Sequence, residues 1–131
     1  MTANAYLIND VTTASSEMLV QRLLEKAIRS ANEARKAEAA AGGDSRAMRL
    51  RRAFDIVVEL QNSLDFERGG EIARNLDALY EFIRSRLVAA GLSPSEEPID
   101  DAVRILDLIA ETWRRLPEGI NGEGELDAGG A

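Results

Sequence analysis

The side chains that most often carry out catalysis are missing from this chain. Its 131 residues include no histidine and no cysteine. A phosphorelay histidine, a Ser-His-Asp triad, a thiolate nucleophile and the usual zinc ligands are therefore excluded together. Helical bundles often hold metals with a Glu-x-x-His motif, which this sequence cannot form. Only carboxylates, Lys, Arg and Tyr remain, so we expect no enzymatic activity, no cofactor and no metal site.

A short basic run is the next candidate for chemistry. It consists of Arg46, Arg49, Arg51 and Arg52. The whole chain, however, has 23 acidic and 16 basic residues and a formal net charge of −7. Binding to a phosphate backbone depends on Lys and Arg releasing counterions, which an acidic protein disfavours. We interpret the run as a solvated helix face and expect no nucleic-acid partner.

Composition and length predict one helical, globular domain. Hydrophobic residues make up 45% of the chain and charged residues 30%, which is typical of a folded protein. Ala, Leu, Arg and Glu dominate, and these residues favour helix over sheet. The N-terminal residues lack the basic start and apolar block of a signal peptide, and no run of 18 apolar residues is present. We therefore expect a cytoplasmic protein without membrane insertion.

Four segments with helical periodicity are separated by Gly, Ser and Pro. We expect helices over about 16–41, 45–64, 70–90 and 95–116. Short connections make successive helices antiparallel, so the predicted fold is an all-α, antiparallel, up-down four-helix bundle. The bundle should occupy residues 15–117. An extended cap segment should precede it over residues 1–14, and a flexible, acidic, Gly-rich tail should follow over residues 118–131.

The second helix has an apolar arc that is wider than bundle packing requires. A bundle helix needs an arc of about 100°, but apolar side chains here spread over roughly 200°. Ala53, Ile56 and Leu60 widen the arc on one side and Val58 on the other. Either several neighbouring helices bury these residues, or part of the arc is a groove for a partner helix.

Two polar side chains and one apolar segment should make contacts that the helix pattern alone does not supply. Gln61 lies in the middle of the same helix face and needs hydrogen bonds if it is buried. Trp113 should pack in the core with its indole N–H on a polar group. An apolar segment before the first helix, too short to form a helix of its own, must dock on the bundle or be captured by a partner; it contains Tyr6, Leu7, Ile8 and Val11.

Several of these residues also resemble a known family. The most specific block runs from Ser63-Leu64-Asp65 through Gly69-Gly70-Glu71-Ile72-Ala73-Arg74-Asn75-Leu76 to Leu79-Tyr80. Weaker matches lie on both sides, from the Tyr6, Asn9 and Val11 pattern to Thr112-Trp113. Together, over roughly Tyr6 to Leu116, they resemble the flagellar secretion chaperone FliS family.

The resemblance implies a function and a set of contact residues. Members of the family are antiparallel bundles that hold the disordered C-terminal region of flagellin in the cytoplasm, prevent premature polymerisation and support delivery to the export apparatus. The flagellar export gate and a regulatory protein come into consideration as further partners. A regulatory adaptor that binds a transcriptional or translational regulator is the alternative function. The expected partner-binding residues are Tyr6, Leu7, Ile8, Val11, Ala53, Ile56, Leu60, Ile72, Leu76, Leu79 and Tyr80.

Overall fold

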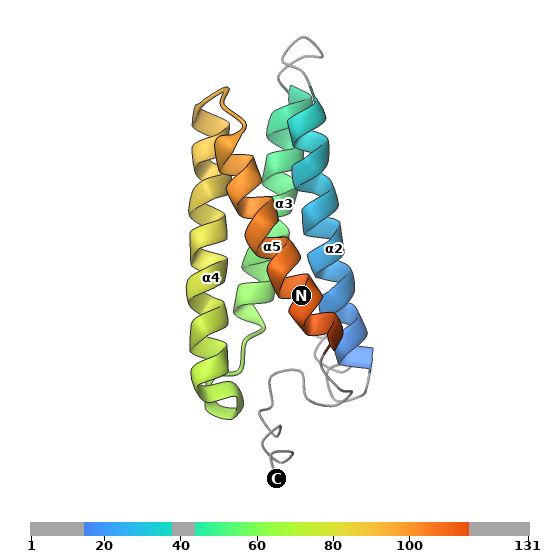
Figure 1. Cartoon of the computed structure of the whole chain (residues 1–131), viewed down its shortest axis with the longest axis vertical. Helices are drawn as coiled ribbons and strands as arrows, with labels where there is room; N and C mark the ends of the chain where they lie inside the picture. The colour runs from blue at the N-terminus through green and yellow to red at the C-terminus, as the bar shows by residue number, and fades with distance from the viewer. Residues whose placement is uncertain (1–14, 38–43, 116–131) are drawn as a thin grey trace.

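The described part of the chain, residues 15–37 and 44–115 of a computed structural model, contains four α-helices and no strand. Successive helices run antiparallel (Figure 1). Each helix packs against two others, in the cyclic order α2, α3, α4, α5 and back to α2. The predicted all-α up-down bundle is therefore confirmed, while the predicted end segments lie outside the described residues. The helices are α2 (Ser15–Lys36), α3 (Asp44–Asn62), α4 (Phe66–Leu92) and α5 (Glu97–Arg115).

The connection between α3 and α4 differs from the expected loop. Asp65 caps the start of α4, because its Oδ1 accepts hydrogen bonds from the amides of Glu67 and Arg68, each at 3.1 Å. One helical turn follows before Gly70, which kinks the helix at φ 50° and ψ −124°. A side chain with a Cβ rarely adopts that conformation. The Asp and the Gly of the family-like block therefore have a local structural role.

The core lies along the bundle axis and is rich in alanine. Small side chains at the contacts allow helices to approach closely, and close packing is what stabilises an interior. In α2 the apolar residues recur at helical spacing and face this core, as the periodicity of the first segment predicts. The fully buried residues include Leu24, Ala27, Ala31 and Ala34 from α2, Ala53, Val57 and Leu60 from α3, Tyr80, Ile83 and Leu87 from α4, and Ile99, Ala102 and Leu106 from α5.

Arg46 holds two helix ends together at one end of the bundle. Its Nη1 donates to the carbonyl oxygen of Ala34 at 3.3 Å, and its Nη2 donates to that of Ala90 at 3.2 Å. The residue four positions after Ala90 is Pro94, which has no N–H to donate. Helix C-termini carry partial negative charge, so a guanidinium there is favourable. The interpretation of the basic run as a solvated face is therefore wrong for Arg46.

Two predicted polar contacts are confirmed. The indole N–H of Trp113 donates to the carbonyl oxygen of Glu17 at 3.3 Å, which joins α5 to α2. Gln61 is half-buried, and its Nε2 donates to Asp77 Oδ1 at 2.8 Å. The Oε1 of Gln61 accepts from Arg84 Nη1 at 3.0 Å.

Among the described helices, none is long and apolar enough to cross a membrane.

Candidate functional site

Exposed apolar side chains gather where α4 and α5 meet. The ion pair between Arg86 Nε and Asp101 Oδ2, at 3.3 Å, sets the register of these antiparallel helices. One helical turn further along, Phe82 of α4 and Ile105 of α5 come opposite each other. Phe82 is 42% exposed and Ile105 is half-buried. An apolar surface therefore begins directly beside the ion pair.

The same register continues the surface toward the start of α4. A further turn brings Leu79 opposite Leu108, which is 57% exposed. Beyond them on α4 lie the half-buried Leu76 and Ile72, which is 43% exposed. We call this surface the apolar strip and define it by Ile72, Leu76, Leu79 and Phe82 of α4 and Ile105 and Leu108 of α5.

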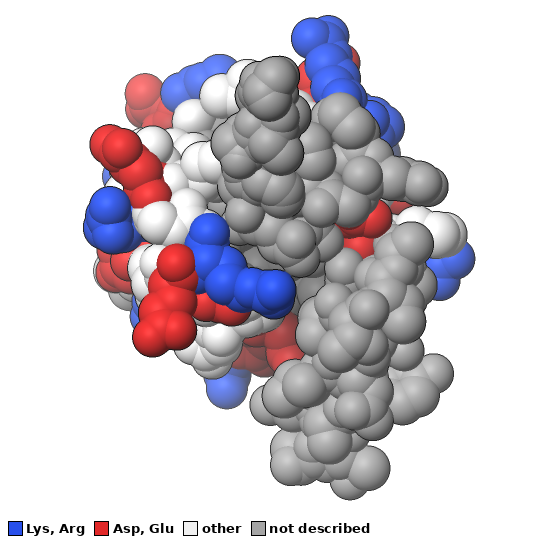
Figure 2. Space-filling model, turned by 90° about the horizontal axis from the view of Figure 1, so that it is seen from below, with Lys and Arg blue, Asp and Glu red and all other residues white. Residues whose placement is uncertain are grey.

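No ionisable side chain belongs to the apolar strip, and ion pairs close one of its ends. There Asp101 accepts from both Arg86 and Arg104, each at 3.3 Å. Elsewhere charge is mixed: at the end of the bundle seen in Figure 2, basic and acidic side chains alternate over the described surface. The strip therefore offers a partner apolar contact, without a field that selects one sign of charge.

Three of the predicted partner-binding residues lie in the core instead. Ala53, Leu60 and Tyr80 are at most 2% exposed. The second-helix arc is wide because α2 covers one of its flanks and α4 the other, so for Ala53 and Leu60 the first alternative, burial by neighbouring helices, holds. Burial also raises the pKa of the Tyr80 phenol by desolvation. These residues can touch a partner only if the bundle opens.

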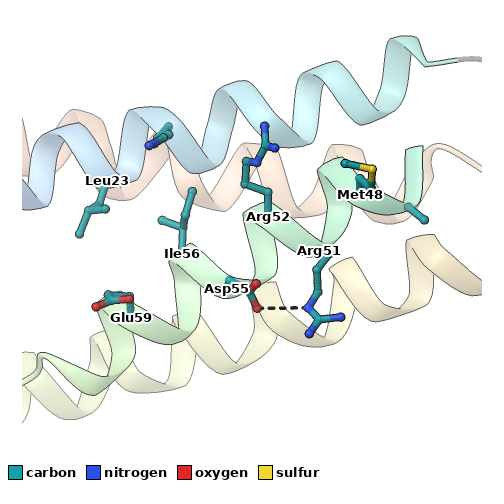
Figure 3. Close-up of a pocket in the computed structure, with 9 residues that line it drawn as sticks. Leu23, Met48, Arg51, Arg52, Asp55, Ile56 and Glu59 are labelled. Carbon is teal, nitrogen blue, oxygen red and sulfur yellow. Dashed lines mark hydrogen bonds and ion pairs between the residues drawn. The ribbon is translucent and has the colours of Figure 1, made fainter. Parts of the chain in front are cut away.

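Ile56 lies apart from the other predicted residues, between α2 and α3. It lines a groove of about 740 Å³ whose wall also includes Leu23 from α2 and Met48 from α3. Figure 3 shows Ile56 and Arg52 reaching from α3 toward α2, and Leu23 reaching from α2 toward α3. The groove also includes Ala47, which is exposed although its spacing from Leu50 and Phe54 suggests the core side of α3.

Tyr6, Leu7, Ile8 and Val11 lie outside the described residues, so their contacts stay a prediction. Among the described residues, the predicted set omits Phe82, Leu108 and Met48, although each is exposed. The positions of Phe82 and Leu108 on their helices are the sequence signals that could have identified them. Phe82 lies at the edge of the core stripe of α4, and Leu108 lies on the opposite side of α5 from Leu106. A large apolar side chain off the core stripe is a candidate for a partner contact.

A small antiparallel bundle with an uncharged apolar strip belongs to the class of helical protein-binding domains. Comparison with known proteins narrows this class. The model of the family described as "Flagellar protein FliS" matches residues 1–119. This chain belongs to the FliS family.

Named relatives agree with this assignment. The "Flagellar secretion chaperone FliS" of Vibrio cholerae is 30% identical over 109 residues, 83% of this chain and 80% of the relative. That of Campylobacter jejuni is 31% identical over 113 residues, 86% and 88% of the two chains. That of Salmonella typhimurium is 32% identical over 111 residues, 81% and 79% of the two chains. The family supports a chaperone role in flagellar secretion.

Proposed function

We propose that this chain is a cytoplasmic, non-catalytic export chaperone for flagellin. It binds the disordered C-terminal region of flagellin, prevents its premature polymerisation and supports its delivery to the flagellar export apparatus. The observation that carries the proposal is the apolar strip on a bundle of the FliS family. A partner helix with its own apolar stripe fits such a surface.

The size of the apolar strip limits what it can do alone. From Ile72 to Phe82 it follows α4 for ten residues, which corresponds to about 15 Å, or three helical turns. A disordered segment that folds on binding typically buries about 1,000–3,000 Å² to offset its lost backbone entropy. The strip is therefore one anchoring site within a longer contact.

A polar substitution of the aromatic residue of the strip tests this role. Phe82→Ser should weaken binding of a flagellin C-terminal fragment about tenfold or more, because a single aromatic anchor often dominates an interface. Val88→Ser is the matched control, since Val88 is 51% exposed on α4, against 42% for Phe82, but lies outside the strip. Isothermal titration calorimetry measures both. Equal affinities for Phe82→Ser and wild type would remove the strip from the flagellin site.

Salt separates apolar from electrostatic binding. Raising the salt concentration from about 0.1 to about 1 M shortens the Debye length from ~10 to ~3 Å. Affinity for the fragment should change little over this range, and the heat-capacity change should be negative. A steep loss of affinity with salt would contradict binding through apolar contacts.

The N-terminal segment adds a second question. If Tyr6, Leu7, Ile8 and Val11 cover the partner surface in the free chain, deletion of residues 2–11 should tighten binding, because a covered site lowers the apparent affinity. If Tyr6 instead contacts flagellin, the same deletion should weaken binding. Titration of both forms with one fragment distinguishes the two roles.

A further inference from the structure

The outer face of α2 and α3 carries cations without counter-ions. Arg22, Lys26 and Arg29 follow one another at helical spacing along the exposed side of α2, and Arg52 is exposed on α3. Within the described residues none of the four forms an ion pair. In α4 and α5, by contrast, every arginine from Arg84 onward is ion-paired: Arg84, Arg86, Arg104, Arg114 and Arg115.

Two of these cations border the groove between α2 and α3. The ion pair between Arg49 and Glu33, at 2.9 Å, fixes the antiparallel register of the two helices, and both Lys26 and Arg52 line the groove. Its apolar wall includes Leu23, Ile56 and Met48, which is 59% exposed. An apolar surface with basic side chains beside it is suited to an amphipathic segment of the opposite charge.

The acidic residues of the groove do not cancel this preference. Asp55 is paired with Arg51 at 3.4 Å, which neutralises both (Figure 3). Glu59 remains, near Leu23 at the opposite end from Met48. Glu59 is therefore the one groove carboxylate that can offset the two positive charges of Lys26 and Arg52. This local excess of positive charge occurs in a chain whose net charge is −7.

We propose that the α2–α3 groove binds an acidic amphipathic helix of a second protein. Leu- or Met-sized side chains of this helix pack on Leu23, Ile56 and Met48, and its carboxylates face Lys26 and Arg52. A nucleic acid fits less well, because its phosphates gain nothing from the apolar wall and are repelled by Glu59. The cyclic order of the helices places the α2–α3 pair, which carries this groove, opposite the α4–α5 pair, which carries the apolar strip. If the proposed function holds, flagellin and the acidic helix bind at the same time.

Two designed peptides test the groove on the full-length protein. Both carry the same leucine stripe on an amphipathic helix, but one is flanked by Glu and the other by Lys. By fluorescence anisotropy, wild type should prefer the acidic peptide by about tenfold. The double variant Lys26→Glu, Arg52→Glu should invert the preference, while Arg74→Glu, an exposed control on α4, should not. Because inversion requires a folded groove, unfolding of the variant cannot imitate it.

Other outcomes overturn the proposal. Equal affinity for the two peptides, or a preference that the double variant leaves unchanged, would mean that the cations do not select the occupant. NMR signals that shift at Leu108 rather than at Ile56 and Met48 would move the peptide to the apolar strip. A short single-stranded RNA that displaces the peptide would assign the cations to nucleic acid.

A flagellin fragment separates this proposal from the proposed function. A saturating C-terminal fragment should leave the affinity for the acidic peptide unchanged. Displacement of the peptide would make the groove part of the flagellin site and end the proposal of a second partner. If the fragment itself fails to bind, the proposed function fails while the peptide measurements still decide the role of the groove.

Discussion

The two outer faces of the bundle use charge in opposite ways. On the α4–α5 side, the arginines from Arg84 onward are paired with carboxylates of the same chain, and the apolar strip between the helices has no charge of its own. On the α2–α3 side, Lys26 and Arg52 stand beside apolar side chains without an ion pair among the described residues. The first face selects a partner by apolar shape and the second also by sign of charge.

This difference shows why net charge alone describes the molecule poorly. A value of −7 suggests a surface that repels anions everywhere. Ion pairs, however, occupy most arginines of α4 and α5, whereas Arg22, Lys26, Arg29 and Arg52 of α2 and α3 have no ion pair among the described residues. Screening restricts such fields to about 10 Å at 0.1 M salt. Local pairing therefore decides what each face attracts.

The largest expected effect compares the core with the exposed edge of the apolar strip, whose Leu76, Leu79 and Ile105 pack against the core. Leu106 is fully buried, whereas Leu108, two residues away on α5, is 57% exposed. Leu106→Ala should lower the free energy of unfolding by about 2–5 kcal/mol through lost burial and a cavity. Leu108→Ala should lower it by less than about 1 kcal/mol. Urea unfolding measures both, and a comparable loss at Leu108 would make the strip part of the structural core.

A smaller effect separates two arginines of the same basic run. Arg46→Met removes the donors to the carbonyl oxygens of Ala34 and Ala90 and should lower the free energy of unfolding by about 1–3 kcal/mol. Arg52→Met removes an exposed cation with no partner in the described structure and should change stability by less than about 0.5 kcal/mol. The same urea titration compares them. If the two variants are equally stable, Arg46 does not hold the helix ends together.

Sequence reasoning could predict the fold because local signals agree along the chain. Gly, Ser and Pro separate the four periodic segments, and the core stripe of α2 follows from periodicity alone. The exact helix ends were less predictable: α4 begins at Phe66, before the Gly70 kink, rather than at residue 70, while the end expected near Ala41 lies outside the described residues. Helix ends depend on single caps, which periodicity does not encode.

The site was less predictable because it depends on pairs of helices. Periodicity gives the width of the arc on α3, but the directions from which α2 and α4 approach decide that Ala53 and Leu60 are buried. The apolar strip requires the register of α4 against α5, which an ion pair between residues 86 and 101 fixes. Arg46 likewise bonds to a carbonyl oxygen 44 residues away. Such contacts follow from packing, not from the local pattern.

The smallest expected effect concerns the carboxylate that neutralises the end of α5. Glu111 accepts from Arg114 at 2.9 Å and from Arg115 at 3.1 Å. The hydrogen bond and charge of Arg114, then the charge of Arg115, lower the pKa of Glu111 from its usual 4.5. A lowered pKa in the folded state stabilises the fold above the unfolded-state value, and this contribution is lost as the pH falls through the folded-state value.

Glu111→Gln should therefore lower the melting temperature slightly at neutral pH and not at all at a pH far below 4.5, where the wild-type carboxyl is also neutral. The effect is small because Glu111 is exposed and solvent screens its ion pairs. Glu71→Gln, at an exposed glutamate of α4 with no ion pair in the described structure, is the control. Glu111→Gln also removes the counter-ion of Arg115, so α5 gains an unpaired cation like those of α2. An equal decrease in melting temperature at both pH values would show that Glu111 stabilises the fold through packing. Charge pairing at this position would then not contribute to the difference between the two faces.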